Sequence, residues 1–253
     1  MIDNVVLASI NLHAVLRNIE DLSMLDPAVR GILAADDLSI RFAVPGLDKL
    51  VLGFAKGICT AKRGDTIPYT MNLHFSGPDH FNQMIAGTKN PLPTKGFRHI
   101  GFLKEAFTKT AEILTAYLRP DPARLRTDAE FRRISTILTA YTAFYALSEV
   151  ANLDRLGRMN AARIEDGDIN VEIAGGCSIY VRKQDGRLST HKGQSDLARA
   201  FMHFDSVDTA CGILTGQLDS FACIGQGRLS FRGRIPMIEN LNRLLSQVQQ
   251  YLA

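Results

Sequence analysis

Two histidines stand at equivalent positions in a repeated pattern, and repeated histidines can serve as general bases or metal ligands. His74 recurs as His203, 129 residues later, and an aspartate follows five residues after each, at Asp79 and Asp208. A histidine near a carboxylate is a candidate acid–base pair. Strand alternation, however, places His203 opposite Met202, which favours an outward histidine. Both aspartates fall near predicted helix starts, where a carboxylate stabilises the helix dipole.

No further metal ligand accompanies these histidines, because His80, His99 and His191 have no histidine counterparts in the repeat. The four cysteines form no C-x-x-C pair and lie far from zinc-like spacing, so we expect reduced, mostly buried thiols. They are Cys59, Cys177, Cys211 and Cys223. Nucleophile-elbow, P-loop and dinucleotide motifs are absent from the sequence. We therefore predict no catalytic residue, no metal and no cofactor; the sequence favours a binding protein and leaves enzyme activity open.

Arginines gather late in the chain, where they could anchor an anionic group or solvate a sheet edge and a helix face. These are Arg228, Arg232, Arg234 and Arg243. An earlier group is interleaved with acidic residues, which favours a solvated helix start and at most peripheral contact with a membrane. Its members are Arg124, Arg126, Arg132 and Arg133.

The composition is that of an ordinary globular protein. The 253 residues are 46% hydrophobic and 22% charged, with a net charge of +3. These values exclude a collagen, a disulfide scaffold and wholesale disorder, and the charge is too small for a dedicated nucleic-acid binder. Asp3 stands where a signal peptide carries positive charge, and no apolar run approaches the roughly 18 residues of a membrane span. We expect a cytoplasmic protein.

The chain carries one pattern twice. The matches are Leu25-Asp26 with Leu153-Asp154 at an offset of 128, Val51 with Val181 at 130, the two histidines at 129, and Tyr117-Leu118 with Tyr251-Leu252 at 134. A period near 130 residues gives each copy enough chain for its own core. We expect two tandem domains, residues 1–119 and 120–253, joined by the proline-containing segment Arg119–Pro122.

Each copy is expected to be an α+β unit in which helices cover one face of a mainly antiparallel five-stranded sheet. In the second copy, helical spacing runs from 131 to about 153, from 206 to 215 and from Pro236 onward. Period-two alternation and turn signals predict strands over 169–173, 177–183, 187–192, 197–204 and 228–232, with the first four as a meander. In the first copy, the expected helices are 5–22, 27–33, 78–86 and 102–118, and the expected strands are 39–44, 50–55 and 69–75.

Three segments of the second copy form a pattern known from one family. They are the strand end Met202–Asp205, the helix and turn Gly212–Asp219, and the run Gly225–Gly233, which reads GQGRLSFRG. On these residues the copy resembles the sterol-carrier-protein domain, a type-two, non-specific lipid-transfer domain. Gln217 replaces the lysine usual in that family, whereas Arg228 preserves the cation of its glutamine-glycine-lysine strand. The first copy departs from the pattern at Thr94–Gly101.

The resemblance implies an apolar tunnel between sheet and helices that carries a sterol, fatty acyl chain or other lipid without bond chemistry. Ten apolar residues of the second copy either line this tunnel or fill a solid core. They are Ile213, Leu214, Phe221, Ile224, Leu229, Phe231, Met237, Leu241, Leu244 and Leu245. The expected partner is a lipid or another hydrophobic small molecule and not a nucleic acid, and a homodimer stays open.

Two other functions fit the same sequence. One is a scaffold or dimerisation module whose interior is filled by large side chains. The other is an enzyme that has recruited the pocket for a lipophilic substrate, with His203, His74 or Asp208 as general acid or base. A histidine facing the pocket beside a carboxylate would favour the enzyme, and an outward histidine would oppose it.

Overall fold

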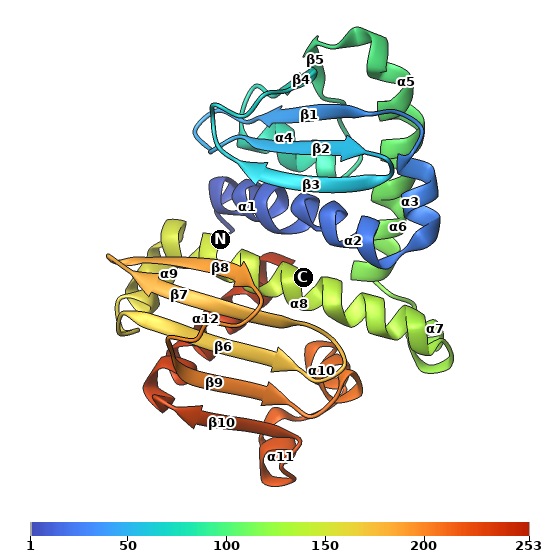
Figure 1. Cartoon of the computed structure of the whole chain (residues 1–253). Coiled ribbons are helices and arrows are strands. Elements are labelled where there is room, and N and C mark those ends of the chain that lie inside the picture. Colours follow the sequence, from blue (N-terminus) through green and yellow to red (C-terminus); the bar gives the residue numbers. More distant parts are fainter. Residues whose placement is uncertain (1, 253) are drawn as a thin grey trace. The chain divides into compact units, whose positions relative to one another are not determined.

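The computed structural model describes residues 2–252, which divide into two compact units, 2–120 and 121–252. Each unit contains one five-stranded sheet with helices (Figure 1). The expected α+β class and the mainly antiparallel sheets are confirmed. Within the described part of the chain, no helix combines the length and the apolar character that a membrane crossing requires.

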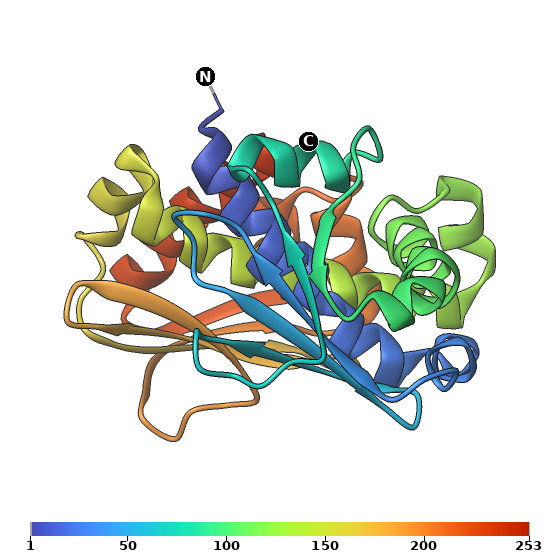
Figure 2. The ribbon, with the colours of Figure 1, turned by 90° about the horizontal axis from the view of Figure 1, so that it is seen from above.

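The first unit has the strand order β3-β2-β1-β4-β5. Its strands are β1 (Leu38–Ala43), β2 (Leu50–Ala55), β3 (Ile58–Arg63), β4 (Met71–His74) and β5 (Leu92–Lys95). Its helical segments are α1 (Asn4–Ile10), η1 (Asn11–Val15), η2 (Leu16–Asn18), α2 (Ile19–Leu25), α3 (Pro27–Leu33), α4 (Pro78–Ile85), η3 (Phe97–His99), α5 (Ile100–Phe102), η4 (Leu103–Phe107) and α6 (Thr108–Leu118). Figure 2 shows α1 and α4 on the same side of this sheet.

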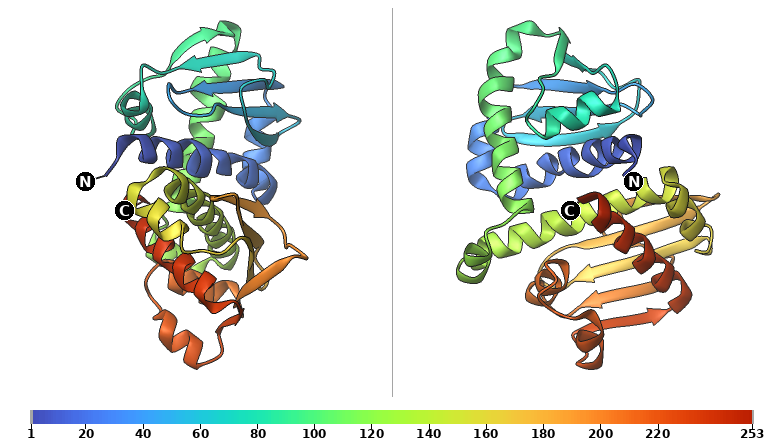
Figure 3. Two further views of the ribbon diagram at one scale, coloured as in Figure 1. Left: turned by 90° about the vertical axis from the view of Figure 1, so that its left-hand side faces the viewer. Right: turned by 180° about the vertical axis from the view of Figure 1, so that it is seen from behind.

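The second unit has the order β10-β9-β6-β7-β8. Read from the other edge, this order is β8-β7-β6-β9-β10, which is the order of the first sheet with β6 to β10 in place of β1 to β5. Its strands are β6 (Gly167–Ile173), β7 (Ser178–Gln184), β8 (Arg187–Lys192), β9 (Ala198–Phe204) and β10 (Leu229–Gly233). Its helices are α7 (Pro122–Thr127), α8 (Ala129–Leu153), α9 (Arg155–Ala161), α10 (Val207–Leu214), α11 (Ser220–Gly225) and α12 (Ile235–Leu252). Both α8 and α12 cross one face of the sheet, and the core of the unit lies there (Figure 3).

The expected four-strand meander is wrong at its fourth strand. β6, β7 and β8 pair in sequence, but β9 returns to pair in parallel with β6, and β10 pairs antiparallel with β9. The first unit repeats this pattern, because β4 pairs in parallel with β1. Alternation of apolar residues fixes which face of a strand is buried, but it does not fix which strand lies beside it.

Two strands of the first unit were not expected. β3 follows a two-residue turn at Lys56-Gly57, whose φ angles of 50° and 80° suit a tight hairpin. β5 carries Pro93 and lies at the sheet edge, where a missing backbone donor is tolerated.

The same side-chain tie occurs in both units. The Tyr117 hydroxyl donates to Asp26 Oδ2 at 3.0 Å, and the Tyr251 hydroxyl donates to Asp154 Oδ2 at 2.9 Å. Both aspartates also cap a helix, since their other carboxylate oxygen accepts from the backbone at the start of α3 and α9. Each tyrosine–aspartate hydrogen bond therefore fixes the last helix of a unit, α6 or α12, against the start of α3 or α9.

One of the sequence matches is out of register by one residue. Val181 pairs with Ile169 on the helix-covered face of its sheet, whereas Val51 pairs with Arg41 on the opposite face, although Val51 is itself buried. The counterpart of Val181 is Leu52, at the offset of 129 that the histidines also show. A shift of one residue reverses the face of every side chain in a strand, so only this offset keeps the core residues inside.

Candidate functional site

The repeated histidines lie on the outer faces of their sheets. His203 is half-buried beside Glu172, with 3.4 Å between Nδ1 and Oε2, and both side chains are more than two-fifths exposed. His74 is exposed, and its neighbour on the paired strand is Ala43, which carries no carboxylate. The expectation of an outward strand histidine is confirmed. Both side chains face away from the helix-covered side of their sheets.

The other polar candidates have structural partners. Asp208, in the first turn of α10, pairs with Arg132 at 2.7 Å, and Asp79, in the first turn of α4, accepts from Gln83 at 2.9 Å. Three of the cysteines are buried and Cys177 is half-buried, all as free thiols. Among residues 2–252, no three histidine, cysteine or acidic side chains come together as a metal site requires.

The late arginines do not form one anion site. Arg228 donates to Thr209 Oγ1 through Nε and Nη2, at 3.1 and 2.8 Å, and Arg234 pairs with Glu165 at 2.9 Å. Arg232 lies over the Phe201 ring, with its Cζ atom 6.0 Å from the ring centre. The three arginines thus have separate partners along the sheet edge, which agrees with the alternative that they solvate this edge and do not together anchor an anion.

The ten predicted apolar residues divide by exposure. The buried ones are Leu229, Met237, Leu241 and Leu244; the half-buried ones are Ile213, Leu214, Phe231 and Leu245; the exposed ones are Phe221 and Ile224. A completely filled core would bury all of these side chains. More than half of the set therefore retains access to solvent or to a ligand.

Phe231 shows why this surface stays open. On β10 it pairs with Met202 of β9, whose side chain is buried on the helix-covered face, so Phe231 points to that same face. It is nevertheless only half-buried. β10 is the edge strand of the sheet, and α12 contacts both β9 and β10. Phe231 thus faces the helices and still keeps part of its surface exposed.

α11 adds apolar side chains beside the same edge. This six-residue helix contacts β10 and buries only Cys223. Phe221 is 81% exposed and Ile224 is 38% exposed. Phe221 and Ile224 stand three residues apart on this helix and so share one exposed apolar face, which makes α11 a candidate contact for an apolar molecule or surface.

The interior of the first unit beneath β1 and β2 is filled by aromatic rings. Phe54 of β2 packs against Phe102 and Phe107, with ring centres 5.2 and 6.4 Å apart, and Phe42 of β1 lies 5.9 Å from Phe107. All four rings are buried. The two units therefore differ in how completely large side chains occupy the space between sheet and helices.

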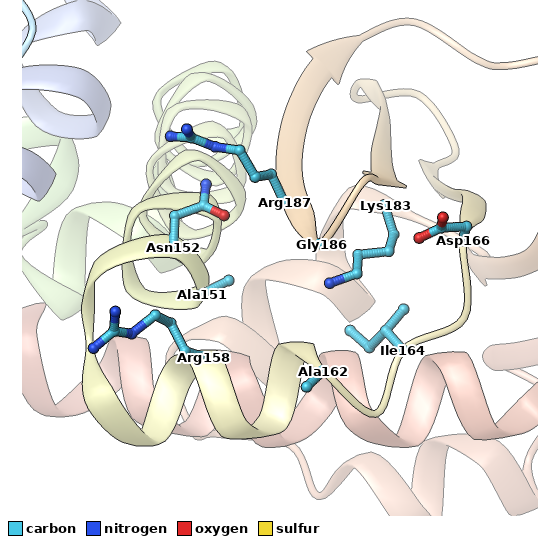
Figure 4. A pocket seen from close by; sticks show the side chains of 9 residues that line it. All are labelled: Ala151, Asn152, Arg158, Ala162, Ile164, Asp166, Lys183, Gly186 and Arg187. Atoms are coloured by element: carbon cyan, nitrogen blue, oxygen red, sulfur yellow. The ribbon is translucent and has the colours of Figure 1, made fainter.

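A cavity of about 570 Å³ opens at the other edge of the second sheet, where sequence analysis predicted no site. Nine residues line it, shown in Figure 4: Ala151, Asn152, Arg158, Ala162, Ile164, Asp166, Lys183, Gly186 and Arg187. Asn152 is held in place because its amide donates to the Leu188 carbonyl and accepts from the Leu188 backbone N–H. The signal in the sequence was a lysine at an inward strand position, Lys183, where alternation calls for an apolar residue.

No family model and no curated protein matches the chain. Solved structures similar to it include sterol carrier protein domains, the family that the second copy resembles in sequence. The UbiJ-SCP2 ubiquinone synthesis protein is 16% identical, with 44% of this chain and 95% of that chain covered and a TM-score of 0.35. Domain 2 of the sterol carrier protein of Helicoverpa armigera is 14% identical, with coverages of 44% and 89% and a TM-score of 0.36. Sterol Carrier Protein 2 Like 2 of Aedes aegypti is 11% identical, with coverages of 41% and 94% and a TM-score of 0.26.

Proposed function

We propose that the second unit binds and carries a hydrophobic small molecule, a lipid, a fatty acyl chain or a sterol-like compound, without bond chemistry. The observation that carries the proposal is Phe231, an inward-facing aromatic residue on an edge strand that the helices leave half-exposed. The ligand would lie against the inner face of β9 and β10, between α10, α11 and α12. Its apolar contacts would complete the burial of residues that the fold leaves partly open.

Apolar contact alone can supply useful affinity at such a site. Each methylene group that leaves water contributes about 0.8 kcal/mol, so a long acyl chain needs few polar anchors. Met237 supports the proposal because a flexible thioether adapts to ligands of different shape. The exposed ring of Phe221 would then meet the ligand, or the membrane from which it comes, first.

The proposal assigns carriage to the second unit alone. The departure of Thr94–Gly101 from the GQGRLSFRG pattern supports this assignment, because the part of the first unit that corresponds to β10 lacks that sequence. The shared strand order and the tyrosine–aspartate ties support the inference that the units are tandem copies of one fold. A cytoplasmic location, a homodimer and peripheral contact with a membrane stay predictions from the sequence.

The first test is native mass spectrometry of the purified full chain, before and after incubation with palmitic acid, cholesterol or palmitoyl-CoA. We expect one bound molecule per chain, and Phe231→Gln should weaken its binding roughly tenfold through lost apolar contact. The matched control is Leu92→Gln, which changes an exposed apolar residue on β5, the edge strand of the first unit. An apo mass with all three probes would refute carriage and leave the scaffold function. Two molecules of palmitic acid or of cholesterol bound per chain would refute the assignment to one unit.

A further inference from the structure

The cavity between α8, α9 and the β7–β8 hairpin contains a lysine in a place where the fold calls for an apolar residue. Ile179, Val181 and Lys183 follow one another along the inner face of β7. Lys183 is 6% exposed, and within residues 2–252 its ammonium group makes no hydrogen bond or ion pair. Burial lowers the pKa of this lysine, while the charge of Asp166 acts in the opposite direction. Its ammonium group opens into the cavity, so this cation is partly desolvated and has gained no partner in return.

The first unit shows what occupies this place when no site is built. At the offset of 129, the counterpart of Lys183 is Phe54, which packs into the aromatic cluster of that unit. The hairpin turns correspond as well, since Lys56-Gly57 and Asp185-Gly186 have φ angles of 50° and 80° and of 51° and 78°. A phenyl ring in one copy and a lysine in the other thus stand at the same point of the same fold.

The space around the turn differs in the same way. A Cβ atom added to Gly57 would lie 2.3 Å from the carbonyl oxygen of Arg30, so α3 closes directly onto this turn in the first unit. A Cβ atom added to Gly186 would meet no other atom of the described chain within 4 Å. The second unit therefore leaves open the space that the first unit closes, and it places Lys183 there.

The charges around the cavity favour an anion. Lys183 and Asp166 lie on one side of it, and the side chains of Arg158 and Arg187 extend on the other, beyond Asn152 (Figure 4). Neither arginine forms an ion pair among the described residues. Three cations less one carboxylate leave two positive charges, and a phosphate monoester carries about −1.5 to −2 near neutral pH. Ala151, Ala162 and Ile164 add an apolar wall for the rest of the molecule.

We propose that this cavity is a binding site for a small molecule bearing a phosphate monoester, with Lys183 as its charged anchor and Arg158 and Arg187 at its rim. The cavity volume of about 570 Å³ lies in the range of small-molecule sites. The phosphate can come from a soluble metabolite or from the headgroup of a lipid. The site is distinct from the apolar surface at β10, because β7 and β8 form the opposite edge of the sheet.

Isothermal titration calorimetry of the full chain tests the site with inorganic phosphate, phenyl phosphate and dioctanoyl phosphatidic acid. We expect one phenyl phosphate per chain, and Lys183→Met should weaken its binding roughly tenfold to a hundredfold, the range of a charge-assisted hydrogen bond. Arg187→Gln should weaken it less, because that side chain is exposed. The matched control is Arg243→Gln, an exposed arginine on α12, and it should leave binding unchanged.

Thermal unfolding separates loss of the site from loss of the fold. Without ligand, Lys183→Met should unfold at the same temperature as the wild type or higher, since a partly desolvated, unpaired charge is removed. Phenyl phosphate should then stabilise the wild type and not the variant. Binding of both phosphate probes identifies a soluble ligand, and binding of phosphatidic acid alone identifies a lipid headgroup; either result supports the site. Absence of binding by all three probes, or equal binding by Lys183→Met, would overturn it.

Discussion

His13 should make the first unit sensitive to mild acid. The imidazole is buried in η1, where Nε2 donates to the Asp48 carbonyl at 3.1 Å and Nδ1 has no hydrogen-bond partner among the described residues. Burial, together with the positive charges of Arg63 and Arg17, lowers the pKa of His13 from 6.5 to about 3, although Asp48 acts in the opposite direction. The folded unit therefore holds this histidine neutral.

The sign and size of the effect follow from this shift. Because the pKa is lower in the folded state, the unfolded chain binds the proton between about pH 6.5 and pH 3, and the stability of the unit falls as the pH falls through that window. At about 1.4 kcal/mol per pKa unit, the free energy of unfolding of the first unit should be about 2 kcal/mol lower at about pH 5 than at pH 7. His13→Gln keeps a donor for the Asp48 carbonyl and removes the titration, so it should abolish this loss.

Methionine oxidation by hydrogen peroxide across a urea gradient measures each unit separately in the intact chain. Met71 is fully buried in β4 and reports on the first unit, whereas Met237 is buried in α12 and reports on the second. The control variant is His74→Gln, which changes an exposed histidine on β4, the strand that also carries Met71. If Met71 in His13→Gln lost as much protection at pH 5 as in the wild type, the burial of a neutral His13 would not be the cause.

Two further changes test the second unit through the oxidation of Met237. Asp168→Asn removes a buried carboxylate that accepts hydrogen bonds from Nε and Nη2 of Arg182 and from the Ser195 hydroxyl. The free energy of unfolding of the second unit should fall by about 2 kcal/mol, less than for a fully buried ion pair, because Arg182 is partly exposed. Arg182 lowers the pKa of Asp168, so the wild type should hold this advantage above about pH 4 and lose it as the pH falls further; an equal urea midpoint at pH 7 would contradict this. Gly157→Ala would place a Cβ atom 2.1 Å from the Val150 carbonyl oxygen, so α9 would have to move away from α8. The free energy of unfolding of the second unit should fall by about 1–3 kcal/mol. An unchanged urea midpoint for Met237 oxidation would show that the two helices are not in tight contact here.

Local sequence patterns were sufficient to predict most of the helices and strands. The helix expected over 27–33 is α3, and alternation with Asp-Gly turns predicted β6, β7 and β8. These signals are local, because a cap or a hairpin involves residues close together in the chain. β5 escaped prediction because a short proline-bearing edge strand exists through its pairing with β4. The parallel pairing of β9 with β6 escaped for the same reason, since pairing between distant segments leaves no trace in period-two alternation.

The sequence likewise predicted some features of the candidate sites and not others. The sequence identified the apolar residues of the second copy and the outward direction of His203, because both depend on alternation within one strand or helix. It did not identify which of those apolar residues stay exposed, since that depends on where α10, α11 and α12 end over the sheet. Lys183 was visible as an exception to an apolar pattern, but its cavity was not. That cavity exists because α9 and the β7–β8 turn do not close on one another.

The sequence by itself determined that this chain carries one α+β pattern twice, where most strands and helices begin and end, and which residues are apolar enough to be buried. These are consequences of composition, periodicity and capping, which act over a few residues. Only the tertiary structure decided the strand order, the filling of the first unit by aromatic rings, the half-exposed Phe231 and the lysine in an open cavity. Each of these depends on how side chains distant in sequence share a limited volume, and no local pattern encodes that volume.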